Sequence, residues 1–296
     1  IISLPLIKEK PDLIHFEWIS QAVDFEWVFD FFECPIVVSN RGRQLNILPH
    51  IPEYAQYVND LLRIIAKSDA VHCVCEDIKQ QAVNLGMPPE KGIVVYTAVD
   101  PEIFTPIQRR PSNEKLTIVM VGSLIWRKGY DFALLAFQKI LNEGIDARLI
   151  IIGSGEDHDH LVFTAKDLLI SEEVQFIGRL DNEKVLEILQ SGDIFLHTAV
   201  SEGIPNAMIE AMACGLPVIA ADCGGIREAV DDGIEGIIVS PRNFLETANA
   251  IDKLVKSPDL RLKMENAGRE RVMRQFTIQM QTEKFNALYQ ELIKNY

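Results

Sequence analysis

Two glutamates flank the start of a helix that the sequence predicts in its second half. Glu202 and Glu210 lie eight positions apart in a segment that is otherwise small or apolar. Eight helical residues rise about 12 Å, so the two carboxylates cannot act on one bond, but they can hold the two ends of an extended ligand. Pro205 suits the first helical position and Gly215 the residue just past the helix. The unpaired N–H groups and positive dipole end of such a helix form a site for phosphate.

Two cations mark a second candidate site. Arg127 and Lys128 follow a predicted strand that ends at Val121 and a turn at Gly122, and they directly precede another predicted helix. Positive charge opposes the dipole at a helix N-terminus, so we expect an anion to compensate these side chains. The alternative is an ordinary basic pair in solvent.

The elements that must position these residues alternate along the chain as strand-like and helix-like runs. Several strands are continuous apolar runs, which are typical of parallel sheets covered on both faces. The predicted strands are 13–16, 35–39, 70–75, 93–97, 116–121, 147–152, 174–177, 194–197, 217–220 and 236–239. The predicted helices include 130–142, 182–191, 205–214, 244–257 and 277–294. This alternation predicts a doubly wound α/β fold.

A break in the pattern divides the chain into two domains. Residues 105–115 hold two prolines and several polar residues, with four predicted strands before them and six after. None of the 17 glycines precedes Gly42, so the glycine-rich turn that opens a complete dinucleotide-type domain is missing. We therefore expect an incomplete first domain over residues 1–108, a second domain over 109–276 and a final helix over 277–296.

The segment around the two glutamates resembles a known family. The Glu-x7-Glu pair is followed by Ala-Cys-Gly-Leu-Pro-Val-Ile-Ala and by Gly-Gly-Ile-Arg-Glu at residues 224–228, which is similar to the donor site of retaining family-4 glycosyltransferases. The resemblance is strong over residues 116–296 and looser over 11–104. It implies a GT-B fold, in which two Rossmann-like domains hold a nucleotide-sugar in the cleft between them.

The resemblance also implies roles for individual residues. Glu210 would hold the ribose hydroxyls, Glu202 would position the donor sugar, and Lys128 would bind the diphosphate. Ser123 stands where the family has an arginine, and Arg127 would supply that charge from a neighbouring place. The remaining donor-binding positions, many of them backbone contacts, are Gly203, Ile204, Asn206, Ala207, Gly122, Ser123, Gly153, Gly155, Ile177 and Arg179.

Three histidine-containing stretches leave alternatives open. The family has His-x-His at the end of its first-domain strand, where this chain has His15 and Glu17, so His15 is a candidate catalytic residue and either side chain can face the sugar. His197 ends a strand just before Glu202, where packing or hydrogen bonding fits as well as catalysis. Residues 157–160, Asp-His-Asp-His, suggest a metal, but acidic residues also favour the start of a helix, and we expect no metal there.

The composition limits the partners. There are 29 basic and 43 acidic residues, a net charge of −14, which argues against broad nucleic-acid binding. No apolar run approaches the roughly 18–20 residues of a membrane span, so we expect no stable membrane insertion. Five cysteines without a Cys-x-x-Cys motif favour reduced thiols. We expect a cytoplasmic protein, with peripheral attachment to the inner membrane face left open.

These inferences converge on one hypothesis. The chain would move a sugar from a UDP- or GDP-sugar to a hydroxyl of a saccharide or lipid-linked acceptor, with retention of configuration, in polysaccharide or glycoconjugate synthesis. Neither a metal nor a cofactor is required, because fixed cations can stabilise the leaving diphosphate. A donor-binding fragment without turnover and a nucleotide-sugar epimerase of similar fold are the alternatives. A dehydrogenase is disfavoured because no complete Gly-x-Gly-x-x-Gly follows a strand.

Overall fold

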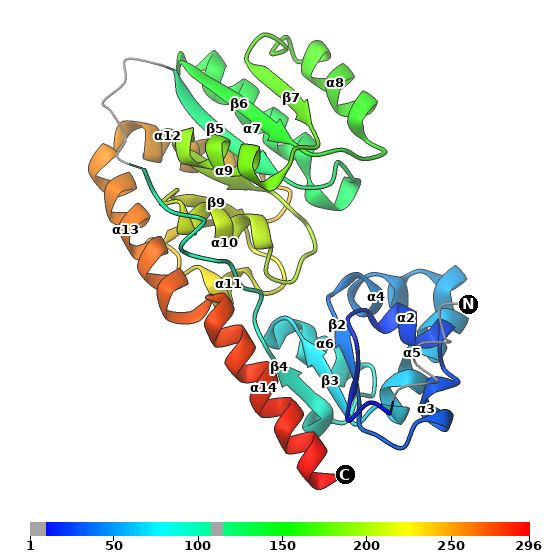
Figure 1. Cartoon of the computed structure of the whole chain (residues 1–296). Helices are drawn as coiled ribbons and strands as arrows, with labels where there is room; N and C mark the ends of the chain where they lie inside the picture. The colour runs from blue at the N-terminus through cyan, green and yellow to red at the C-terminus, as the bar shows by residue number, and fades with distance from the viewer. Residues whose placement is uncertain (1–9, 108–114) are drawn as a thin grey trace. The chain divides into compact units, whose positions relative to one another are not determined.

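The computed structural model describes residues 10–107 and 115–296 and divides the chain into two compact units (Figure 1). The first unit runs to Thr97 and includes Gln279–Tyr296, and the second unit comprises Ala98–Ile278. The N-terminal nine residues and most of the predicted domain boundary lie outside the described residues. Each of the two units has a sheet of its own.

The first unit runs to Thr97, whereas the predicted domain boundary at residue 108 lies outside the described residues and stays a prediction. The segment after Ala98 is held in the second unit by Arg269 of α13 (Pro258–Gln275). The Arg269 guanidinium donates hydrogen bonds to the carbonyl oxygens of Pro101 (2.7 Å) and Phe104 (2.6 Å). A side chain far along the sequence thus helps to hold the start of the second unit.

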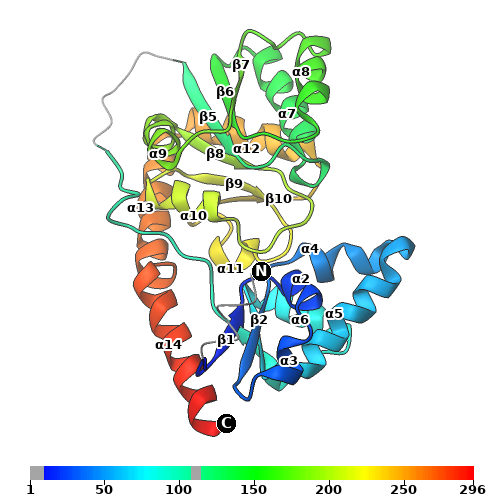
Figure 2. The ribbon, with the colours of Figure 1, turned by 45° about the vertical axis from the view of Figure 1, so that its right-hand side comes forward.

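The first unit contains a parallel sheet with the order β1-β2-β3-β4 within the described residues. Its strands are β1 (Ile14–Phe16), β2 (Ile36–Asn40), β3 (Ala70–Cys73) and β4 (Gly92–Val94). Its helices are α2 (Ile19–Asp24), α3 (Val28–Phe31), α4 (Arg43–Asn46), α5 (Ala55–Lys67) and α6 (Glu76–Asn84). The terminal helix α14 (Ile278–Asn295) lies along this sheet (Figure 2). Its Leu288 is in one buried cluster with Val37 and Ala70 of the sheet.

The second unit contains a parallel six-stranded sheet with the order β10-β9-β8-β5-β6-β7. Its strands are β5 (Leu116–Val121), β6 (Ala147–Ile152), β7 (Val174–Gly178), β8 (Ile194–His197), β9 (Val218–Ala221) and β10 (Gly236–Val239). Its helices include α7 (Tyr130–Asn142), α8 (His158–Asp167), α9 (Asn182–Ser191), α10 (Asn206–Ala213), α11 (Ile226–Ala229) and α12 (Phe244–Lys256). The predicted doubly wound α/β class is confirmed, and each predicted strand corresponds to an observed one.

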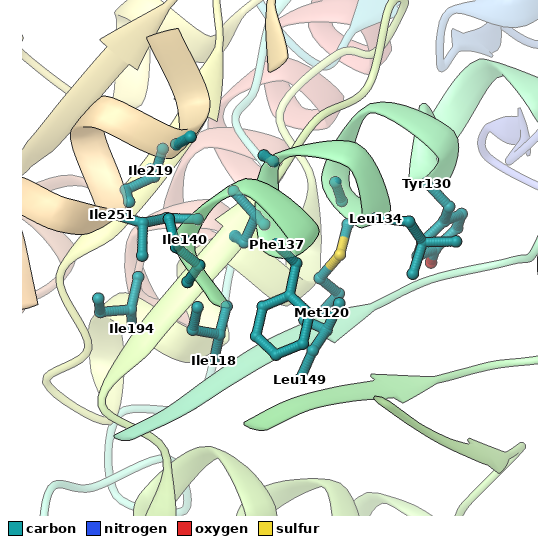
Figure 3. Packing of buried hydrophobic residues seen from close by; sticks show 14 of the residues in the cluster. Ile118, Met120, Tyr130, Leu134, Phe137, Ile140, Leu149, Ile194, Ile219 and Ile251 are labelled. Carbon is teal, nitrogen blue, oxygen red and sulfur yellow. The ribbon is translucent and has the colours of Figure 1, made fainter. Parts of the chain in front are cut away.

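The core of the second unit lies between its sheet and the helices α7 and α12. Phe137 of α7 is fully buried and packs over Ile118 and Leu149 of the sheet, with Ile251 of α12 in the same cluster (Figure 3). The adjacent strand residues Val119 and Ile150 are buried as well, and α9 and α10 contact β5, β8 and β9 of the same sheet. Burial on both faces explains the continuous apolar runs in the sequence.

The strand order creates one special position in the second unit. β5 and β8 are hydrogen-bonded neighbours although β6 and β7 separate them in the sequence. The chain leaves the two strand ends in opposite directions, so their carboxyl ends form a topological switch point, where open α/β sheets bind ligands. Arg127 and Lys128 follow β5, and Glu202 and Glu210 follow β8. The candidates Gly153 and Gly155 follow β6 instead, Ile177 lies in β7 and Arg179 follows β7.

We predict that Phe137→Ala destabilises the second unit by about 3–5 kcal/mol, because the core cannot collapse into the space left by a buried ring. Urea unfolding followed by circular dichroism measures this free energy. Leu262→Ala on α13 is the control, since its side chain is 57% exposed, and its effect should stay within about 0.5 kcal/mol. Equal unfolding midpoints for the two variants would contradict this description of the core.

Candidate active site

The loops that follow β5 and β8 are joined directly to each other. The Thr198 hydroxyl donates hydrogen bonds to the carbonyl oxygens of Lys128 (3.2 Å) and Gly129 (2.9 Å), and the Val200 N–H donates to the carbonyl of Arg127 (2.8 Å). Gly129 has φ +67°, and a Cβ there would overlap the carbonyl oxygen of Thr198. Only glycine therefore permits this approach, which brings the two cations beside the loop that carries Glu202.

The predicted anion beside the two cations is a side chain of the same unit. Arg127 and Lys128 lie in η4 (Trp126–Lys128), and the Arg127 Nη1 atom is 3.1 Å from Glu202 Oε1. The Lys128 ammonium forms an ion pair with the same carboxylate oxygen. The side chains of Lys128 and Glu202 are only 14% and 13% exposed. This is a largely buried cluster rather than the solvated basic pair that the sequence left open.

The charges of this cluster change the ionisation of its members. Burial works to raise the pKa of Glu202, but the positive charges of Lys128 and Arg127, and that of His197 where it is protonated at low pH, outweigh burial and hold the pKa below its ordinary value. Burial, together with Lys128, lowers the pKa of His197 to about 4. At neutral pH the cluster therefore contains two cations, one carboxylate and a neutral imidazole.

Glu210 lies in a different environment on α10. Its carboxylate is half-buried, and none of the described residues forms a hydrogen bond or an ion pair with it. Burial raises its pKa, because no charge or hydrogen bond from the described residues offsets the lost hydration. The helix itself begins at Asn206, with Pro205 as an extended N-cap that provides no side-chain hydrogen bond. Pro205 thus precedes the first helical position predicted for it, because its ψ of 125° is not helical.

Close backbone packing requires glycine at positions 153 and 155, independently of the donor-binding role predicted for them. A Cβ on Gly153 would overlap the carbonyl oxygen of Gly122, and one on Gly155 would overlap that of Leu124. The Leu124 N–H also donates to the carbonyl of Ser154 (3.0 Å). These contacts hold the loop after β6 against the loop after β5.

The Gly-Gly pair at residues 224–225 supports the loop of Glu202. A Cβ on Gly224 would overlap the Glu202 carbonyl oxygen, and the Gly225 N–H donates to the carbonyl of Gly203 (3.1 Å). The sequence contained a signal for this support in its paired glycines. It contained none for Thr198, whose role depends on a contact between distant segments.

The first-unit candidate His15 is engaged within its own unit. Its Nδ1 atom is 2.6 Å from the hydroxyl of Tyr289, and its Nε2 atom is 2.8 Å from the hydroxyl of Ser39. Glu17 forms an ion pair with Arg41 and lies 3.7 Å from His15 Nδ1. Both ring nitrogens of His15 thus have protein partners, and its catalytic role stays a prediction.

The other candidate positions vary in exposure. Ser123, Ile177, Arg179 and Asn206 are exposed, Ala207 is partly buried, and Gly203 and Ile204 are buried. In the suggested metal stretch, His158 contacts Asp159 (2.9 Å), whereas His160 contacts Asp131 of α7 (2.7 Å). No group of three or more potential metal ligands occurs within residues 10–107 and 115–296. In those same residues, no helix is both long and apolar enough to cross a membrane.

Comparison with known proteins identifies the family. Residues 104–271 match the family model for glycosyl transferases group 1, and residues 3–103 match the model for glycosyltransferase family 4. The chain belongs to the group 1 glycosyltransferases. The two parallel sheets of this glycosyltransferase form the Rossmann-like units of a GT-B fold, as the resemblance implied.

This glycosyltransferase is 31% identical over 265 residues to a human phosphatidylinositol N-acetylglucosaminyltransferase subunit, covering 86% of this chain and 53% of that protein. It is 26% identical over 269 residues to N-acetyl-alpha-D-glucosaminyl L-malate synthase of Bacillus anthracis, covering 88% and 68%. The structure of Anabaena HepE with UDP-glucose superposes with a TM-score of 0.81 at 19% identity, covering 94% of this chain and 78% of HepE. The chain thus spans about half the length of the human relative.

The burial of His197 predicts a pH dependence of stability. Its folded pKa of about 4 lies below the ordinary 6.5, so the unfolded chain binds more protons between these values, and stability falls as the pH drops from 6.5 to 4. We predict that His197→Gln reduces this fall by on the order of 3 kcal/mol in urea unfolding measured across the window. His158→Gln, at a surface histidine, should leave the slope unchanged. Parallel slopes for wild type and His197→Gln would exclude a neutral buried imidazole.

Proposed function

We propose that this glycosyltransferase transfers a sugar from a UDP-sugar to an acceptor hydroxyl with retention of configuration and without a metal ion. The observation that carries the proposal is the pair of cations at the end of β5. Arg127 and Lys128 lie at the switch point of the second unit, beside the loop that leads into α10. The UDP-glucose bound to HepE, which shares the fold, supports a uridine nucleotide as the first donor to test.

The two ends of the donor would bind to different parts of α10 and its loop. The diphosphate carries the negative charge that Lys128, Arg127 and the N-terminus of α10 can compensate. Glu210 lies more than a turn further along the helix, with a carboxylate that lacks partners in the described residues and can accept hydrogen bonds from ribose hydroxyls. Glu202, at the loop, would contact the sugar.

The chemistry requires stabilisation of the leaving group. The bond between the sugar C1 atom and the β-phosphate oxygen breaks, and negative charge grows on that phosphate. Lys128 and Arg127 stabilise this charge more in the transition state than in the bound donor. The acceptor oxygen then bonds to C1 on the same face of the sugar, and its proton passes to the departing phosphate oxygen. Glu202 positions the sugar and does not attack it.

The relatives narrow the substrates to be tested. Both sequence relatives carry an N-acetylglucosaminyl group in their names, and the human one is named for phosphatidylinositol. We infer that UDP-N-acetylglucosamine is the donor to compare first with UDP-glucose and GDP-mannose. A lipid-linked or saccharide hydroxyl remains the acceptor class. Product analysis separates transfer from the alternatives, since an epimerase changes the sugar without an acceptor and a binding fragment releases no nucleotide.

We predict that Lys128→Met lowers kcat for release of UDP from the donor by about 10²–10³-fold, because one stabilising charge on the leaving phosphate is lost. A coupled assay of UDP release with each donor sugar measures the rate. Lys253→Met removes an exposed positive charge from α12 of the same unit and should retain the wild-type rate. Equal rates for Lys128→Met and wild type would rule out the assigned diphosphate site.

Glu210→Gln should weaken UDP binding by about 10–100-fold, because a neutral amide forms weaker hydrogen bonds with ribose hydroxyls than a carboxylate does. Calorimetry with UDP measures the affinity. The substitution should affect a 2′,3′-dideoxy analogue of UDP much less, since that ligand lacks both hydroxyls. A similar loss for both ligands would show that Glu210 acts elsewhere.

A further inference from the structure

One carboxylate of the candidate active site, that of Glu202, competes with the diphosphate for the same two cations. The cations proposed for the diphosphate, Arg127 and Lys128, are both paired with Glu202 in the structure of the chain alone. Glu202 also has a proposed role of its own, at the donor sugar. One carboxylate cannot pair with both cations and bind the sugar while a diphosphate occupies the same cations, so donor binding must rearrange this cluster.

Glu202 supplies the negative charge that pairs with both cations of the cluster. It is the sole acidic side chain with an ion pair to Arg127 or Lys128 in the part of the chain that the structure describes. His197 is buried beside the cluster and its Nε2 atom has no hydrogen-bond partner there. At neutral pH the imidazole is neutral and does not change the net charge of the cluster. Two cations therefore face one carboxylate, and the cluster retains one positive charge for an incoming anion.

Neighbouring glycines hold the backbone of Glu202 in place. The Glu202 carbonyl packs on Gly224, where a Cβ would overlap it, and the following Gly203 accepts the hydrogen bond from Gly225. The backbone of the cations is held in the same way by Thr198. A rearrangement of the cluster then takes the form of side-chain rotations, without movement of either loop.

We infer that, in the free chain, the Glu202 carboxylate pairs with the two cations of the diphosphate subsite. When the donor binds, this carboxylate leaves Lys128 and Arg127 and binds the hydroxyls of the sugar. This inference rests on the proposed function. A diphosphate brings at least two negative charges to a pair of cations that share one, so it displaces the carboxylate. The exchange frees Glu202 for the sugar only when a diphosphate is present, and it couples recognition of the two parts of the donor.

The test is calorimetry of UDP, inorganic pyrophosphate and uridine with wild type and Glu202→Gln. The substitution removes the competing charge, so UDP and pyrophosphate should bind about 10-fold more tightly, which is a typical size for coupling between sites. Uridine, which lacks the diphosphate, should bind both proteins equally. Glu172→Gln removes an exposed acidic charge from the same unit and should change neither affinity. Glu202→Ala should show the same gain if the glutamine variant unfolds.

The outcomes separate this inference from the proposed function. Wild-type binding of UDP with no gain, or with a loss, in the folded Glu202 variants overturns the inference and leaves the proposed donor site standing. An equal gain for uridine also overturns it, since the effect then has nothing to do with the diphosphate. Failure of every nucleoside diphosphate to bind wild type overturns the proposed function and the inference together.

Discussion

The close approach of the loops after β5 and β8 is the constraint on which the candidate active site depends. Gly129 lies against the carbonyl of Thr198, and the Thr198 hydroxyl binds two carbonyl oxygens of the β5 loop. These contacts exist because the sheet order places β5 beside β8. Without them, Arg127 and Lys128 would lie on a loop of their own. With them, the cations and Glu202 form one cluster at the point where this type of sheet leaves room for a ligand.

The sequence contained enough information to predict the elements but not their tertiary contacts. Helices α7 and α9 have the predicted bounds, because apolar residues at helical spacing and clear turn residues mark both ends. The switch point depends on the pairing of β5 with β8, which the order of the elements along the chain does not reveal. The pairing of Glu202 with Lys128 could not be predicted in the same way, since it joins residues on separate loops whose distance is set by the sheet. The hydrogen bonds of Arg269 to the carbonyl oxygens of Pro101 and Phe104 are long-range contacts of the same kind.

The first unit illustrates why a motif position does not by itself assign a role. His15 stands where the resemblance places a catalytic histidine, yet its ring joins a chain of polar groups that continues through Ser39 to His72. Burial lowers the pKa of His72 to about 4 and also lowers that of His15. Tyr289 enters this chain from the terminal helix, some 270 positions away in the sequence. Hydrogen bonding within the unit satisfies these side chains, and the catalytic role of His15 stays a prediction.

The second unit contains the opposite case, a polar cluster that folding alone does not explain. Removing two cations and a carboxylate from water is expensive, and apolar side chains of similar volume often stabilise a fold as well or better. The cluster also leaves an excess positive charge and a buried imidazole nitrogen without a partner in the described residues. Glu210 adds a desolvated carboxylate that nothing in the described chain compensates. A group that lacks a full set of partners in the folded chain has few interactions to give up when it binds a ligand of matching charge and hydrogen-bonding capacity. The excess positive charge of the cluster and the uncompensated carboxylate of Glu210 therefore argue against a purely structural role. They favour a ligand that carries anionic groups and hydroxyl groups at a fixed separation. A nucleotide-sugar carries both kinds of group.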